Sequence, residues 1–212
     1  MKEIQVKDLQ LNPMTLISDG WMLITAGNEQ NGFNTMTASW GHLGAIWGTN
    51  KGLPTATVYI RPQRYTKEFV DREEEFTLSF FSNDYKRQLA YLGTHSGRDE
   101  DKVAKMGLTP EFVDNTTYFK EADLVLVCRK IYKAPLVEEG FLDKKLITEN
   151  YPEKDFHTMY IGEITRVLTT NKIKSLIFSV FYKAPKCLVV FRKLYNHKEI
   201  KATLPSLHPG YT

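Results

Sequence analysis

The sequence predicts a mainly β fold, an antiparallel sheet or barrel with a few short covering helices. Short apolar runs rich in β-branched and aromatic residues recur along the chain, and Gly, Pro, Asn and Asp separate them. Aromatic residues make up 12% of the chain, which suits side chains that pack on a pleated surface. The predicted strands cover residues 21–25, 33–40, 56–60, 76–81, 117–119, 124–131 and 158–168.

Helices are predicted in only three short segments: 66–72, 84–91 and 96–107. Thr66 is expected to cap the first, because a threonine hydroxyl accepts a hydrogen bond from a free N–H group of the first turn. In the third, an acid follows Ser96 by three residues and Gly107 closes the segment, which is the pattern of a capped start and stop. The polar segment 142–152 is expected to be a linker before the last strand.

The composition is that of an ordinary soluble protein long enough for one substantial core. Hydrophobic residues make up 42% of the 212 residues and charged residues 25%. No run has the length of a signal-peptide core or a membrane span, so we expect a cytoplasmic protein with no membrane partner. Cys128 and Cys187 form no CxxC pair and lie in apolar runs, so buried, reduced thiols are expected.

The charge of the chain is uneven. The net charge is +3, yet residues 171–212 hold eight Lys or Arg against one acid. We therefore predict one domain over residues 1–168 and a basic, aromatic tail over 169–212. The tail is open to three interpretations: an extra strand pair, an arm exchanged in a dimer, or a stretch where the reading frame has drifted. Its charges lie among aromatic residues with no known motif, so nucleic acid is not an expected partner.

The predicted strand 33–40 alternates apolar residues with a row of small hydroxyls: Thr35, Thr37 and Ser39. One interpretation is a face turned to water, because Thr is common in half-exposed strands. The other is a surface on which a flat polar ligand lies close to the backbone. Nearby glycines permit close approach and two tryptophans could wall a planar ligand, which favours the second interpretation.

Residues 61–66, Arg-Pro-Gln-Arg-Tyr-Thr, form a cationic loop between a predicted strand and a predicted helix. Two arginines, two hydroxyls and the free N–H groups of a helix start are what a phosphate group needs. The alternative is a solvated turn whose arginines pair with the acids at 73–75.

Residues 94–98, Thr-His-Ser-Gly-Arg, together with Lys102, form a second cationic loop at a predicted helix start. Its N–H groups and its cations could hold a phosphate. The alternative is ordinary capping, with Arg98 and Lys102 neutralised by the acids at 99–101. Taken together, the two loops and the hydroxyl row indicate an anionic, planar ligand.

Reactive side-chain motifs are missing from the sequence. It contains no dinucleotide-binding or Walker A glycine pattern, no nucleophile elbow, and no metal-ligand spacing among its five histidines. A bound cofactor would therefore have to supply any strong chemistry.

Five motifs in order, NTMTASWG, RPQRYT, LSFF, GTHSGRDEDK and YIGEI, resemble the flavoredoxin branch of the flavin reductase-like FMN-binding split-barrel family. The resemblance spans about residues 10–168 and implies a Greek-key split β-barrel. It also implies a homodimer with FMN bound at or near the subunit interface. The hydroxyl row would then be the floor on which the flavin lies.

The resemblance also implies roles for residues that match the family motifs. The isoalloxazine ring and ribityl chain would be lined by Asn34, Thr35, Met36, Thr37, Ala38, Ser39 and Trp40. The ribityl or phosphate end would be reached by Arg61, Arg64, Tyr65 and Thr66. The phosphate site would be completed by Ser96, Gly97, Arg98 and Lys102. No side chain is assigned as a catalytic acid or base.

The function that the resemblance implies is an FMN-binding oxidoreductase or electron-transfer protein of the flavoredoxin type, with a small-molecule or protein redox partner. One alternative is an NAD(P)H:flavin oxidoreductase that uses FMN as a dissociable substrate. The other is an FMN-binding module without catalysis. NAD(P)H is a candidate reductant in the first two cases.

Overall fold

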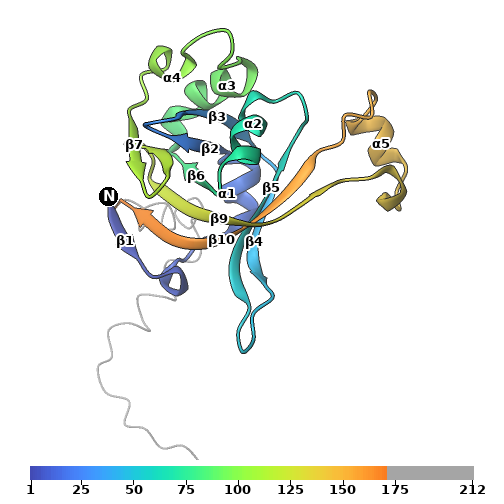
Figure 1. Ribbon diagram of the computed structural model, residues 1–212, viewed down its shortest axis with the longest axis horizontal. Coiled ribbons are helices and arrows are strands. Elements are labelled where there is room, and N and C mark those ends of the chain that lie inside the picture. Colours follow the sequence, from blue (N-terminus) through green and yellow to red (C-terminus); the bar gives the residue numbers. More distant parts are fainter. Residues whose placement is uncertain (171–212) are drawn as a thin grey trace, which may run out of the picture. The chain divides into compact units, whose positions relative to one another are not determined.

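Seven strands form one antiparallel sheet in the order β3-β2-β6-β9-β10-β5-β4, and an eighth, β1, pairs with β10. The computed structural model describes residues 1–170 (Figure 1). The strands are β1 (Lys2–Ile4), β2 (Met22–Asn28), β3 (Gly32–Ala38), β4 (Gly41–Ile46), β5 (Leu53–Ile60), β6 (Glu75–Phe80), β9 (Leu124–Pro135) and β10 (Thr158–Thr169). A separate hairpin consists of β7 (Pro110–Val113) and β8 (Thr116–Phe119).

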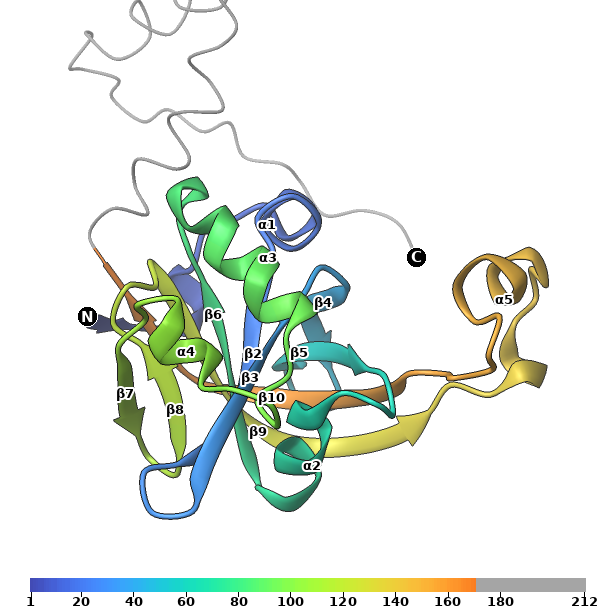
Figure 2. The same ribbon diagram turned by 90° about the horizontal axis from the view of Figure 1, so that it is seen from above.

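The two edges of the sheet, β3 and β4, are consecutive in the chain, with only Ser39 and Trp40 between them. The sheet must therefore curl round until its edges meet at one end, although β3 and β4 do not pair. β2–β3, β4–β5 and β9–β10 are antiparallel pairs of consecutive strands. This confirms the predicted mainly β split barrel with a few covering helices, and Figure 2 shows the curled sheet from above.

Two hydrophobic clusters pack on opposite faces of this sheet. The inner one contains alternate residues of β2, such as Met22 and Ile24, with Met36 of β3 and Phe76 of β6. The outer one contains Leu23, which points the other way, and lies under helices and the β7–β8 hairpin. Because both faces of β2 are covered, this strand lacks the polar alternation of a half-exposed strand.

The helices are short. They are α1 (Pro13–Ser18), α2 (Tyr65–Arg72), α3 (Lys86–Thr94), α4 (Lys102–Lys105) and α5 (Lys145–Asn150), with 3-10 turns at Val6–Asp8, Asn83–Tyr85 and Glu138–Gly140. Two of them, α3 and α4, pack on the outer cluster, α1 and α2 contribute to the inner one, and α5 lies away from the barrel (Figures 1 and 2). All seven predicted strands and the three predicted helical regions are present with shifted ends. The sequence prediction missed β1, α1, β4, β7 and α5.

Both predicted N-cap residues, Thr66 and Ser96, are wrong. Helix α2 begins one residue earlier than predicted, with Arg64 at the N-cap position, so Thr66 lies inside the first turn and caps nothing. The segment predicted as a helix from Ser96 is turn until Asp101, whose carboxylate caps the single turn of α4 by accepting from the Ala104 N–H group at 3.0 Å. Asp and Ser are about equally favourable at the N-cap position, and this segment contains both, so the sequence alone did not decide between Ser96 and Asp101.

The predicted linker 142–152 contains helix α5 and is part of a larger excursion. Residues 136–157, called the arm below, leave the barrel after β9 and return at β10 (Figure 1). Strand β4 was missed because its glycines resemble loop residues. A Cβ atom at Gly41 would lie 2.8 Å from the Thr57 carbonyl oxygen, so this glycine permits close packing between neighbouring strands.

Cys128 is a buried free thiol, as predicted, and burial raises the pKa of that thiol. Cys187 and the tail from residue 171 lie outside the described residues, so the predicted domain boundary stays a prediction. Within residues 1–170, no helix is long and apolar enough to cross a membrane, and no cluster of side chains fits a metal ion.

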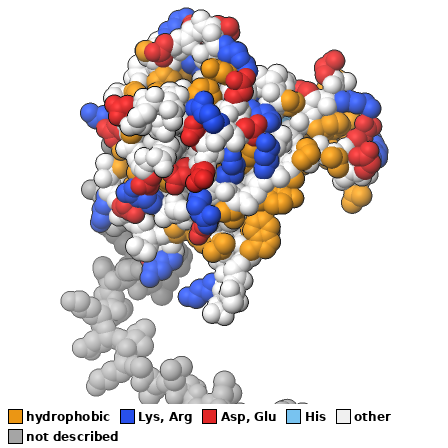
Figure 3. Space-filling model, in the orientation of Figure 1, with side chains coloured by type: hydrophobic (Ala, Val, Ile, Leu, Met, Phe, Trp, Pro, Cys, Tyr) orange, Lys and Arg blue, Asp and Glu red, His pale blue; other side chains and the backbone are white. Residues whose placement is uncertain are grey.

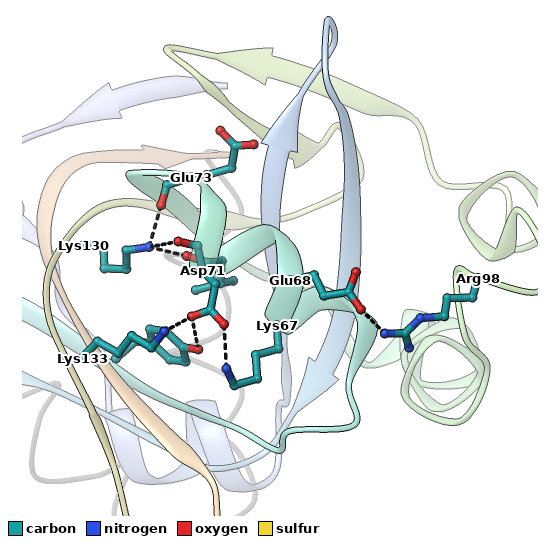
Figure 4. A network of polar contacts seen from close by, with 9 residues as sticks. Lys67, Glu68, Asp71, Glu73, Arg98, Lys130 and Lys133 are labelled. Carbon is teal, nitrogen blue, oxygen red and sulfur yellow. Dashed lines mark hydrogen bonds and ion pairs between the residues drawn. The ribbon is translucent and has the colours of Figure 1, made fainter.

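A polar network around Asp71 fixes the C-terminal end of α2 to the sheet (Figure 4). The carboxylate accepts hydrogen bonds from Lys133 of β9 at 2.5 Å and from Lys67 at 2.6 Å. The Tyr160 hydroxyl of β10 adds a third at 2.8 Å. Burial alone would raise the pKa of Asp71. The hydrogen bonds from Lys133, Lys67 and Tyr160 outweigh burial and lower the pKa to about 2.

Lys130 supplies a second anchor at the same end of α2 (Figure 4). Its ammonium group donates to the carbonyl oxygens of Val70, of Asp71 at 3.0 Å and of Glu73 at 2.7 Å. A cation suits this place, because the last carbonyl groups of a helix are unpaired and carry partial negative charge. The network therefore holds α2 from its C-terminal end, which leaves its N-terminal end free to face the cavities described below.

Asp71→Asn is expected to lower the free energy of unfolding at neutral pH by about 1–2 kcal/mol, because Asn cannot carry the paired charge. The folded-state pKa lies below the unfolded one, so this stabilisation is present above about pH 4 and is lost as the pH falls toward 2. Urea unfolding across this range measures the difference between variant and wild type. Glu29→Gln, in an exposed turn, is the control. A difference that stays constant with pH would contradict the assignment.

Candidate functional site

Two adjoining cavities lie along β3 and share Met36 and Arg64. The first, of about 110 Å³, is lined by Asn34, Met36, Gln63, Arg64, Tyr65, Thr66, Leu92, Thr94, His95, Ser96, Gly97 and Lys102. The second, of about 170 Å³, is lined by Met36, Thr37, Ala38, Ser39, Trp40, Tyr59, Arg61, Arg64 and His157. Of the residues predicted to bind the ligand, only Thr35 and Arg98 line neither cavity.

Lys102 is a buried cation at the first cavity, with only 4% of its surface exposed. Its ammonium group donates to the carbonyl oxygens of Leu92 at 3.0 Å and His95 at 2.9 Å, and it pairs with no carboxylate within residues 1–170. Burial, then the nearby Arg64 guanidinium, lowers the pKa of Lys102 to about 8. A buried cation without a counter-ion is costly, and a bound anion would remove that cost.

Arg64 is the second cation at the first cavity. Its Nη1 donates to the Gly93 carbonyl oxygen at 2.8 Å, and no described carboxylate pairs with it. The next residue, Tyr65, begins α2, whose first turn has no side-chain cap. Free N–H groups and the positive end of the helix dipole therefore point to the same side as two cations, which is an arrangement that binds anions.

Gly97 and Asn34 close the wall between the two loops. Asn34 Nδ2 donates to Thr66 Oγ1 at 2.8 Å and so joins β3 to α2. A Cβ atom at Gly97 would lie 2.1 Å from Asn34 Oδ1, so only glycine fits beside Asn34 in this arrangement. Ser96 lines the cavity next to it, and its hydroxyl accepts from the Arg98 N–H group at 3.1 Å.

Arg98 does not face the cavity, contrary to its predicted place in a phosphate site. Its guanidinium pairs with Glu68 of α2 (Figure 4). It also stacks over the Tyr65 ring at 4.4 Å. The alternative interpretation, neutralisation by the acids at 99–101, is also wrong for Arg98. The physical reason is that 96–101 is a turn, which lets the side chain reach across to the neighbouring helix. Arg98 therefore clamps the loop carrying Ser96 and Gly97 against α2.

Arg61 lines the second cavity but already has partners in the arm. Its guanidinium pairs with Asp155 and donates to the Asn150 carbonyl oxygen at 2.6 Å. It also lies 5.2 Å above the Tyr151 ring. The interpretation in which the arginines of this loop pair with the acids at 73–75 is therefore wrong. Arg61 joins the arm to the end of β5, and Arg64 stays the less neutralised cation.

The structure divides the hydroxyl row: Thr35 is buried away from both cavities, whereas Thr37 and the exposed Ser39 line the second cavity. Thr35 is fully buried, and its hydroxyl lies 2.8 Å from that of Thr25. The Thr37 hydroxyl donates to the Leu89 carbonyl oxygen of α3 at 2.5 Å. The period of two assigned the faces correctly, but α3 covers the hydroxyl face. The alternate residues Asn34, Met36 and Ala38 also line the cavities.

Sequence reasoning gave no site role to Gln63, Tyr59 or His157, which also line the cavities. The first lies inside the RPQRYT motif, and His157 stands just before the final YIGEI strand. The position of Gln63 and His157 in or beside a motif was therefore the sequence signal that could have identified them as site residues. What brings His157 to the cavity is the return of the arm at β10.

The chain matches the sequence model of the family described as "Flavin reductase like domain" over residues 14–184. It belongs to that family. This confirms the resemblance and makes the protein a flavin-related oxidoreductase.

Solved structures of three proteins agree with this assignment. Flavoredoxin of Desulfovibrio vulgaris (Miyazaki F) is 25% identical with a TM-score of 0.53, and the match covers 72% of this chain and 70% of that one. Flavoredoxin from Methanosarcina acetivorans is 19% identical with a TM-score of 0.53, over 72% and 69% of the two chains. An FMN-binding protein from Thermus thermophilus is 18% identical with a TM-score of 0.52, over 71% and 70%. No curated protein sequence matches significantly.

The affinity of this flavin reductase-like protein for FMN is expected to fall as the pH rises through about 8, because Lys102 then loses its proton. The loss is about tenfold or more if the ammonium group makes a charge-assisted bond to phosphate. Flavin fluorescence titrations measure it, with riboflavin, which lacks the phosphate, as the comparison. Lys102→Met should bind FMN weakly at pH 7 and show no further loss. An equal pH dependence for riboflavin would contradict the prediction.

Arg98→Met and Glu68→Gln are each expected to weaken FMN binding about two- to fivefold, because an exposed ion pair contributes modestly. Combined, they should weaken it no further, because both break the same clamp. If Arg98 instead contacted phosphate directly, removing the Glu68 charge would leave FMN binding unchanged or strengthen it. Arg72→Met, which breaks an exposed pair with Glu73 on the same helix, is the control.

Proposed function

We propose that the protein is an FMN-binding oxidoreductase or electron-transfer protein of the flavoredoxin type. One observation carries the proposal: Lys102 and Arg64, which pair with no carboxylate in the described part of the chain, meet the uncapped start of α2 at one end of a two-part cavity. The other part is walled by aromatic and small residues. A charged end joined to a flat, weakly polar end matches the two ends of FMN.

Under this proposal each part of the site has its own task. The first cavity holds the phosphate through Lys102, Arg64 and the N–H groups of Tyr65 and Thr66. In the second cavity, Met36 and Ala38 of β3 support the ring and Trp40 walls its edge. Bound FMN would supply the electron transfer, since its ring system accepts and releases electrons.

NAD(P)H:flavin oxidoreductase activity is the second candidate. Trp40 is 45% exposed and stands at the unpaired seam between β3 and β4, so a second small molecule can reach the second cavity. A reductant such as NAD(P)H would enter by this side. Buried Lys102 and the close contact at Gly97 favour tightly held FMN over a dissociable substrate. A module that holds FMN without catalysis is the remaining alternative.

We also propose that the protein is a homodimer. Each cavity is small beside the roughly 300–1,000 Å³ of typical ligand pockets, so one chain alone would leave FMN largely uncovered. Hydrophobic side chains gather over the outer parts of β9 and β10 and over the arm (Figure 3). They include Tyr132, Val137 and Leu142, which are 42%, 50% and 98% exposed. A second copy would cover such a surface.

The proposed function is tested first by the visible spectrum of the freshly purified protein. We expect flavin absorption bands and release of FMN on denaturation. Arg64→Gln should weaken FMN binding about 10- to 100-fold, as for a lost charge-assisted bond, and change riboflavin binding little. Arg129→Gln, at an exposed pair with Glu163, is the control.

A colourless protein that reduces added FMN with NAD(P)H would favour the dissociable-flavin reductase. Failure to bind FMN at all would overturn the proposal.

A further inference from the structure

Tyr151 and His157 form a buried pair at the second cavity. The Tyr151 hydroxyl lies 2.8 Å from His157 Nδ1, and the two residues are 4% and 8% exposed. Tyr151 ends α5 in the arm, whereas His157 precedes β10 and lines the cavity. The imidazole also lies 5.1 Å from the Trp40 ring, centroid to centroid. Neither residue has a part in the phosphate end of the site.

The environment decides which nitrogen of His157 carries the proton. The Tyr151 hydroxyl makes no other hydrogen bond in residues 1–170. If Nδ1 carried the proton and donated to Tyr151, the hydroxyl hydrogen would be buried without an acceptor, at a cost of about 1–3 kcal/mol. The hydroxyl therefore donates to Nδ1, and the proton of the neutral ring sits on Nε2. Nε2 has no partner among the described residues, so its N–H group is available at the cavity.

Burial and a nearby arginine keep this imidazole neutral. Burial, then the Arg61 guanidinium, lowers the pKa of His157 to about 4. Asp155 opposes this shift, and Arg64 adds a smaller contribution in the same direction as Arg61. Near pH 7 the residue is therefore a neutral donor rather than a cation. This distinguishes it from Lys102 and Arg64, which offer full charges.

The arm is built to deliver Tyr151 to this place. The Tyr151 ring packs against Phe141 and Phe156, with ring centroids 5.6 and 5.0 Å away. Arg61 adds its hydrogen bond to the preceding residue, Asn150, and stacks over the Tyr151 ring. An aromatic cluster and an arginine thus fix a hydroxyl whose hydrogen-bond partner is the His157 ring.

We propose that Tyr151 is a positioning residue that fixes His157 in the Nε2–H tautomer, so that His157 offers a neutral hydrogen bond to a carbonyl oxygen of the molecule bound in the second cavity. Two sources have this chemistry: a carbonyl group of the flavin ring, or a carbonyl group of a second molecule beside it. The tautomer follows from this chain alone, and only the identity of the acceptor rests on the proposed function.

The tautomer is tested in flavin-free protein labelled with ¹⁵N-histidine. Long-range ¹H–¹⁵N correlation spectra near neutral pH should show His157 neutral and protonated on Nε2. Tyr151→Phe, which removes only the hydroxyl, should give a mixture of tautomers, and Tyr118→Phe, whose hydroxyl bonds Glu111, should change nothing. An Nδ1–H tautomer or a charged ring in the wild type would overturn the proposal, whether or not the protein binds FMN.

The acceptor is tested with His157→Phe, which lacks the donor, and His157→Gln, which keeps an N–H group. Loss of one neutral hydrogen bond should weaken binding about three- to tenfold in the Phe variant, with partial recovery in the Gln variant. Weaker riboflavin binding would assign the bond to the flavin. Unchanged riboflavin binding with weaker binding of p-hydroxybenzaldehyde to the FMN-loaded protein would assign it to a second molecule. No change with either probe would overturn the proposed donor role.

Discussion

Only Ser39 and Trp40 separate β3 from β4, so the two edges of the sheet come together there, and the two strands do not pair. An unpaired edge leaves backbone N–H and C=O groups free, and natural proteins cover such edges or use them. Here both cavities lie along β3. Helices α2 and α3 contact β3, and the arm ends at His157, whose ring lies beside Trp40 at the same edge. The open seam is therefore the feature on which the site depends.

The site separates charge along its length. At the first cavity, Lys102 and Arg64 repel one another and pair with no described carboxylate, so this end is strained without an anion. At the second, Arg61 is neutralised by Asp155 and His157 carries no charge near neutral pH. A ligand with an anion at one end and an uncharged, flat ring at the other is favoured by both ends. Either half alone would select a simpler molecule, such as a free phosphate or an apolar ring.

The sequence predicted those features that depend on local pattern. Apolar runs identified every strand of seven or more residues within the described part of the chain, and motif residues such as Arg64, Gly97 and Lys102 do line the first cavity. What it could not predict depends on packing at a distance. The period of two gave the two faces of β3, but only the docking of α3 decides that Thr37 bonds to Leu89 and that Met36 faces the cavity. The sequence shows that Arg98 carries a positive charge, but it does not show that its partner is Glu68, which lies thirty positions earlier in the chain.

The arm is a second feature that local sequence patterns did not predict. A polar segment that ends in proline resembles a linker, and nothing local says that Tyr151 will be buried. Its burial follows from three contacts made at once, with Phe141, Phe156 and Arg61. These contacts order the residues of the arm, which a flexible linker would leave free. Ordering them costs conformational entropy. The Arg61 contacts and the buried Tyr151–His157 pair offset that cost at the point where the arm rejoins the barrel, so the second cavity has a fixed wall before any ligand enters.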